Sequence, residues 1–149
     1  MPVLSPTVLE IEREIVAPVE RVFAALSQAE LLQKWHAPFD YTVHHAEVDL
    51  RVGGTYRITM KPPGKEIYHT AYGTYQEITP NVKLVYTWQW DDDSHPGVEN
   101  TLVTLGFESI DGTTTKLKLR HERFPNEAEC EDHQKGWNAC LDNLPKALD

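Results

Sequence analysis

The spacing of apolar residues changes along the chain, and this change limits most strongly what the sequence can fold into. Between Phe39 and Arg123, apolar side chains recur mostly at every second position, which is the period of half-buried strands. Beyond Asn126 the period becomes helical, and one stripe contains Cys130, His133, Trp137, Cys140, Leu141, Leu144 and Leu148. A helix with one apolar stripe must be covered, and the strand region is the only candidate to cover it.

Turn residues divide the strand region into short pieces. Val8–Val16 alternates and is an expected first strand, and six more are expected between Phe39 and Arg123. Asp111-Gly112 is typical of a hairpin turn. Consecutive strands joined by short turns favour an antiparallel meander. The sequence therefore predicts an α+β fold in which a curved, seven-stranded antiparallel sheet wraps around a long C-terminal helix.

Two short helices are expected between the first strand and the meander. Pro18–Leu26 has apolar residues at helical spacing, and Ser27 with Glu30 forms a capping box that would open the second helix. For the last helix, Asn126 is the expected N-cap residue. Pro145 predicts a kink or an early end near Leu144.

The composition bounds the class of protein. A length of 149 residues fits one domain, residues 1–149, with a core from about 8 to 148. The net charge of −9 argues against nucleic acid as a partner. No apolar run reaches the roughly 20 residues that span a bilayer, and Met1–Pro6 lacks a signal-peptide pattern, so we expect a cytoplasmic protein without membrane insertion. Cys130 and Cys140 would lie about 15 Å apart along one helix, too far for a disulfide.

Several motifs follow one another in an order that resembles a known family. They are Ile15–Leu26, Leu31–Trp35, Asp49–Tyr56, Gly73–Ile78, Leu84–Trp88 and Gly136-Trp137 with Leu141 and Leu144. Together they resemble the SRPBCC (START/Bet v 1-like) superfamily, which has the helix-grip fold. The branch is similar to the C-terminal domain of the activator of heat-shock protein 90 ATPase. The resemblance covers residues 8–148 and implies the fold, but the superfamily includes lipid carriers, cyclases and co-chaperone domains, so it leaves the function open.

A sheet that wraps a helix can leave a cavity between them. The expected lining combines inward aromatic and sulfur-containing residues with two inward histidines: Tyr56, Met60, Tyr75, Tyr86, Trp88, Phe107, His121, His133, Trp137 and Cys140. The alternative for each of them is a place in a filled core.

Few residues are candidates for catalysis or for binding an ion. His121 and His133 are the candidates for an acid or base, with a satisfied core histidine as the alternative. Neither a metal site nor a cofactor motif is indicated, because the sequence shows no convergent ligand spacing. Arg13 interrupts the apolar face of the first strand, and we expect it to form a structural ion pair, with binding of a ligand anion as the alternative.

Three functions follow from these residues. The first is non-catalytic binding of a small hydrophobic or amphipathic molecule in the cavity. The second is a cyclase- or hydrolase-like enzyme that uses His121 or His133 in the same cavity. The third, implied by the resemblance, is an interaction domain that stimulates a chaperone ATPase. The sequence begins directly at the first strand, with no preceding domain, so we rank this function third.

Overall fold

A computed structural model describes residues 7–148, so the ends of the predicted domain, residues 1–6 and 149, lie outside the described residues. The described elements are β1 (Leu9–Ile15), α1 (Val19–Ser27), α2 (Ala29–Trp35), β2 (Thr42–Val48), β3 (Thr55–Lys61), β4 (His69–Thr79), β5 (Lys83–Trp90), β6 (Thr101–Ser109), β7 (Thr115–Glu122), α3 (Glu127–Asn143) and a 3₁₀ turn, η1 (Leu144–Ala147). The predicted order of strand, two short helices, meander and long helix is confirmed.

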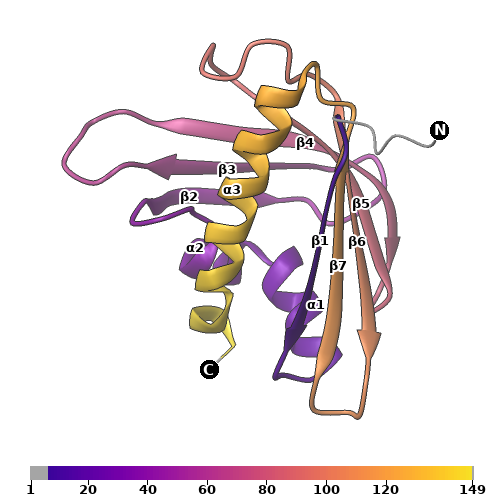
Figure 1. Cartoon of the computed structure of the whole chain (residues 1–149). Helices are drawn as coiled ribbons and strands as arrows, with labels where there is room; N and C mark the ends of the chain where they lie inside the picture. The colour runs from indigo at the N-terminus through magenta and orange to yellow at the C-terminus, as the bar shows by residue number, and fades with distance from the viewer. Residues whose placement is uncertain (1–6, 149) are drawn as a thin grey trace.

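The seven described strands form one antiparallel sheet in the order β1-β7-β6-β5-β4-β3-β2. The meander runs from β2 to β7, and β1 closes the far edge by pairing with β7, with Leu9 opposite His121. The sheet curves, and α3 lies across it in front of β2, β3 and β4 (Figure 1). The predicted α+β fold, a curved sheet that wraps a C-terminal helix, is therefore confirmed.

The capping box predicted at Ser27 and Glu30 is wrong. Ser27 is the last residue of α1, and its buried hydroxyl donates to the carbonyl oxygen of Phe23 at 2.7 Å. Gln28 takes the N-cap position of α2 without a side-chain hydrogen bond. A serine that bonds back to the preceding turn ends one helix, so its hydroxyl is not available to start the next.

Helix α3 begins and ends where the sequence predicts. The Asn126 side chain accepts a hydrogen bond from the backbone N–H of Glu129 at 2.9 Å, which satisfies one of the free donors of the first turn. At the other end the α-helix stops at Asn143, and Pro145 falls in the 3₁₀ turn. The predicted apolar stripe is buried from Cys130 to Leu144. Its burial against the sheet is what holds the helix in place.

Polar contacts fix α3 to the rest of the fold at two further places. Arg13 of β1 forms an ion pair with Asp142 at 3.0 Å and also donates to the side chain of Asn138 at 3.1 Å. The Asn143 amide donates to the carbonyl oxygen of Ala37, after α2, at 3.0 Å. The structural ion pair predicted for Arg13 is confirmed.

Two further expectations concern helices and cysteines. Within residues 7–148, no helix combines the length and the apolar character that a membrane span needs. Cys130 and Cys140 are both buried and carry free thiols, as predicted.

Candidate functional site

A cavity of about 410 Å³ lies between the sheet and α3. Its size is in the range of small-molecule sites. The lining comes from α3, from the aromatic end of β5, from β3 and β4, and from two loops: His36, Pro38, Phe39, Tyr41, Met60, His69, Trp88, Trp90, Ser94, His95, Asp132, His133, Lys135, Gly136, Trp137 and Cys140. Aromatic rings dominate, and the charged groups belong to residues of α3.

Half of the residues predicted to line the cavity do so. Met60, Trp88, His133, Trp137 and Cys140 are among the lining residues. The other five are buried in the core and are not among the lining residues: Tyr56, Tyr75, Tyr86, Phe107 and His121.

Three of these five form a tyrosine cluster that fills the sheet side of the core. The ring centres of Tyr56 and Tyr86 lie 5.0 Å apart, and those of Tyr75 and Tyr86 lie 5.9 Å apart. The Tyr56 hydroxyl donates to the backbone oxygen of Thr87 at 2.6 Å. Burial raises the pKa of Tyr56 and of Tyr86 well above the usual range. These groups are neutral core residues with packed rings.

His121 lies in the core, with both ring nitrogens engaged. Trp137 donates through Nε1 to His121 Nδ1 at 3.0 Å, so the ring proton is on Nε2, which donates to the Thr101 hydroxyl at 2.8 Å. That hydroxyl in turn donates to the backbone oxygen of Trp88. Burial, aided by the nearby His133, lowers the pKa of His121 well below its usual value. The network fixes one neutral tautomer.

His133 lines the cavity but is also held by two hydrogen bonds. Trp90 donates through Nε1 to His133 Nε2 at 2.9 Å, and His133 Nδ1 donates to the backbone oxygen of Glu129 at 2.8 Å. Burial lowers the pKa of the ring, although the bond to the Glu129 carbonyl works in the opposite direction. The ring is therefore neutral, with its proton on Nδ1.

Unlike the ring nitrogens of His121 and His133, two buried polar atoms of lining residues are unpaired in the described part of the chain. Within residues 7–148, His36 Nδ1 and Trp88 Nε1 have no hydrogen-bond partner. Their rings stack with centres 5.9 Å apart. A buried donor or acceptor without a partner costs about 1–3 kcal/mol, which is the kind of cost that functional sites retain.

The burial of His36 makes a testable contribution to the pH dependence of stability. Burial lowers its pKa to about 4, whereas an unfolded histidine titrates near 6.5. The unfolded chain therefore takes up this proton first as the pH falls, and the free energy of unfolding decreases from about pH 6.5 down to about pH 4. We expect His36→Phe to remove about 2 kcal/mol of the stability lost between pH 7 and pH 5. Urea unfolding of both proteins at the two pH values measures it, and equal losses would contradict the assignment.

Several lining residues were missed by sequence reasoning because they lie in loops, where no apolar period indicates direction. Phe39 is 63% exposed and has a φ of 53°, a left-handed backbone that is uncommon for a bulky residue. Tyr41, in the same loop, also lines the cavity, whereas His69 lines it from the first position of β4. The charged residue Asp132 could have been found, because Asp132 and His133 both follow Glu129 by about one helical turn.

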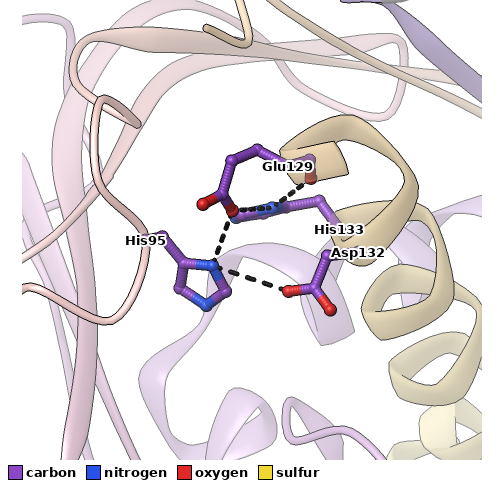
Figure 2. A group of neighbouring side chains, drawn as sticks. All are labelled: His95, Glu129, Asp132 and His133. Atoms are coloured by element: carbon purple, nitrogen blue, oxygen red, sulfur yellow. Dashed lines mark hydrogen bonds and ion pairs between the residues drawn. The ribbon is translucent and has the colours of Figure 1, made fainter. Parts of the chain in front are cut away.

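Those three helical residues meet a fourth from the loop between β5 and β6. His95 Nδ1 lies 2.8 Å from a Glu129 oxygen and 3.5 Å from an Asp132 oxygen, and the labelled side chains in Figure 2 converge on one point. One ligand atom from each of the four residues lies within 4.8 Å of all the others. This arrangement is absent from the sequence-based expectations.

The family model that describes the Activator of Hsp90 ATPase homolog 1-like protein matches residues 16–149. The chain belongs to this family. The SRPBCC fold and the family that the motifs predicted are thereby confirmed. Among curated proteins, none matches the chain.

Solved structures agree with the assignment to the Activator of Hsp90 ATPase homolog 1-like family. A protein from Chromobacterium violaceum is 27% identical, with a TM-score of 0.85, over 96% of this chain and 97% of that one. An HSP90 activator from Plasmodium falciparum is 29% identical, with a TM-score of 0.71, over 93% of both chains. An AHSA1-like protein from Aeromonas hydrophila shares the fold at 22% identity and a TM-score of 0.74, over 94% of this chain and 92% of that one.

Proposed function

We propose that the protein binds a small amphipathic molecule, without catalysis, in the cavity between the sheet and α3. The observation that carries the proposal is the cavity of about 410 Å³ between the sheet and α3, whose wall is largely aromatic. Trp88, Trp137 and Met60 provide apolar contact area. A ligand with an aromatic or aliphatic body would pack against this wall, and a hydrogen-bonding group on it would pair with polar lining residues such as Ser94 and Lys135.

The hydrogen bonds of the two candidate catalytic histidines favour binding over catalysis. An acid or base needs a ring nitrogen that can reach the substrate. Both nitrogens of His121 bond to Trp137 and Thr101, and both nitrogens of His133 bond to Trp90 and the Glu129 backbone. Free, buried thiols at Cys130 and Cys140 are consistent with the reducing cytoplasm that we propose as the location.

A leucine at Gly136 provides a test that leaves the core intact. Gly136 lines the cavity, and a Cβ atom added there meets no atom within 4 Å. Replacing a mid-helix glycine also favours the helix by up to about 1 kcal/mol, so the variant should fold. We expect Gly136→Leu to weaken binding of the amphipathic dye anilinonaphthalene sulfonate at least about tenfold, since the new side chain occupies ligand volume. Fluorescence titration measures the dissociation constant.

Ala139→Leu is the matched control. Ala139 lies on the same helix, but outside the lining of this cavity, so dye affinity should stay as in the wild type. Equal dye affinity of Gly136→Leu and the wild type would sink the proposal. Native mass spectrometry of gently purified protein then gives the mass of the natural ligand.

A second function rests on the solved HSP90 activator from Plasmodium falciparum, which is 29% identical to this chain. In this case the protein would bind a chaperone through its surface and raise its ATPase rate. The measurement is the ATPase rate of a purified HSP90-type chaperone with and without the protein. An unchanged rate, together with no complex in size-exclusion chromatography, would exclude this function.

A further inference from the structure

His95 is held over the start of α3 by rings as well as by charge. Its ring centre lies 5.0 Å from that of Trp90 and 4.7 Å from that of His133. The side chain is about one-fifth exposed, and that of Glu129 is 16% exposed, so both are largely shielded while Asp132 reaches solvent. A loop residue packed in this way has a fixed direction, which is the first requirement of a preorganised site.

The helix supplies two carboxylates on the side that faces His95. Glu129 and Asp132 are three residues apart in α3, so their side chains are neighbours on one surface of the helix. Figure 2 shows both carboxylates directed toward the His95 ring. The nearest oxygens lie 2.8 Å and 3.5 Å from His95 Nδ1. Two ligand atoms bound to one ion at about 2.1 Å lie roughly 3.0–3.4 Å apart, so the observed spacing needs little adjustment.

His95 and His133 differ in whether a ring nitrogen is free to bind a metal ion. Within residues 7–148, His95 Nε2 has no hydrogen-bond partner, so the ring can carry its proton there and present a lone pair at Nδ1. His133 has no such freedom, because Trp90 donates to its Nε2 and its Nδ1 proton is bound to the Glu129 carbonyl oxygen. A ring with both nitrogens engaged is a support for the site and not a ligand.

We propose that His95 Nδ1 and the carboxylates of Glu129 and Asp132 bind one divalent first-row transition-metal ion, with Zn²⁺ as the representative. Imidazole with carboxylate is a donor set suited to such ions. The two carboxylates balance the charge of the ion. Because His95 and Asp132 also line the cavity, the remaining coordination positions are open to water or to a donor atom of a cavity ligand. Mg²⁺ and Ca²⁺ favour all-oxygen sites with more ligands, and they bind here more weakly.

The test uses the full chain without a histidine tag. Isothermal titration with Zn²⁺ is expected to show one site with a dissociation constant of about 10 µM or tighter. Co²⁺ provides a second readout, since its visible absorption reports nitrogen and oxygen ligands directly. We expect His95→Ala, Glu129→Gln and Asp132→Asn each to weaken Zn²⁺ binding at least about tenfold.

The control is another histidine–carboxylate pair of the same protein. His45 Nε2 lies 3.3 Å from Glu47 on the exposed strand β2, and both side chains are more than half exposed. His45→Ala should leave the Zn²⁺ affinity unchanged. The proposal is overturned if Zn²⁺ fails to bind, or if His95→Ala and His45→Ala have equal effects. In that case His95 serves only as an ion-pair partner of α3. Dye binding to the cavity is measured separately, so this result leaves the proposed ligand binding intact.

Discussion

Gly73→Ala is expected to lower the free energy of unfolding by at least about 3 kcal/mol, or to prevent folding altogether. A Cβ atom at Gly73 would lie 1.9 Å from the backbone oxygen of Thr87 and 2.6 Å from its carbonyl carbon. Both atoms belong to the main chain of β5, so neither can rotate away. The two strands would have to separate at this point.

The same carbonyl explains why this position needs a glycine. Tyr56 of β3 is opposite Gly73 in the sheet register, and its hydroxyl reaches across to Thr87 O at 2.6 Å. The Thr87 side chain meanwhile accepts the backbone N–H of Thr74 at 2.9 Å. An alanine would therefore strain the β4–β5 pairing and also disturb the hydrogen bond of the buried Tyr56 hydroxyl to the Thr87 carbonyl.

Urea unfolding followed by circular dichroism measures the effect, and Gly106→Ala is the control. Gly106 is also a strand glycine, in β6, but its added Cβ would meet only Lys118 Cβ at 3.9 Å. We expect this control to change the stability by less than about 1 kcal/mol, since alanine also suits an extended strand better than glycine. Similar losses for the two variants would show that the close approach to Thr87 is not what decides the outcome.

His121→Leu is expected to cost about 2–4 kcal/mol of stability, because it leaves the Trp137 N–H buried without an acceptor. The leucine cannot replace either hydrogen bond of the ring. Trp137→Phe removes the donor instead and is expected to be destabilising as well, through lost volume and an unpaired His121 Nδ1. Each single variant therefore leaves a buried donor or a buried acceptor without its hydrogen-bond partner.

The double variant separates the hydrogen bond from simple packing. Once both partners are apolar, no unpaired group remains, so the combined loss should be smaller than the sum of the single losses by at least about 1 kcal/mol. Chemical denaturation of the four proteins measures this coupling. Strict additivity would mean that the His121–Trp137 contact contributes nothing beyond the space that each residue fills.

The fold could be predicted because its signals are periodic. The stripe from Cys130 to Leu144 indicates which face of α3 is buried, and this prediction is confirmed. In β5 the inward residues Tyr86 and Trp88 are buried as predicted, but Val85 on the other face is buried as well. The N-cap at Asn126 depends only on residues close in sequence, so it could be predicted as well. Ser27 misled the prediction because a serine between two helices can cap the second or bond back to the first, and spacing alone does not decide between them.

Only some of the residues that line the cavity could be predicted, because alternation shows the direction of a side chain but not its neighbours. Alternation indicates that Tyr86 and Trp88 both face inward, but not that Trp88 borders the cavity while Tyr86 packs against Tyr56 and Tyr75. That difference depends on the curvature of the sheet and on the register shift of β4 between Tyr75 and Glu77. The spacing of apolar residues in the sequence contains no information on either feature. His95 was missed because a loop residue acquires a neighbour only through tertiary folding.

The arrangement of the four tryptophans gives the molecule its own optical reporter. Trp88, Trp90 and Trp137 line the cavity, whereas Trp35 lies outside that lining and donates to the backbone of Ala25 at 2.8 Å. Indole emission follows the polarity and mobility of its surroundings, so a molecule entering the cavity alters three of these emitters and leaves the fourth as an internal reference. Occupancy can therefore be followed on the unlabelled chain, by light that the protein itself emits.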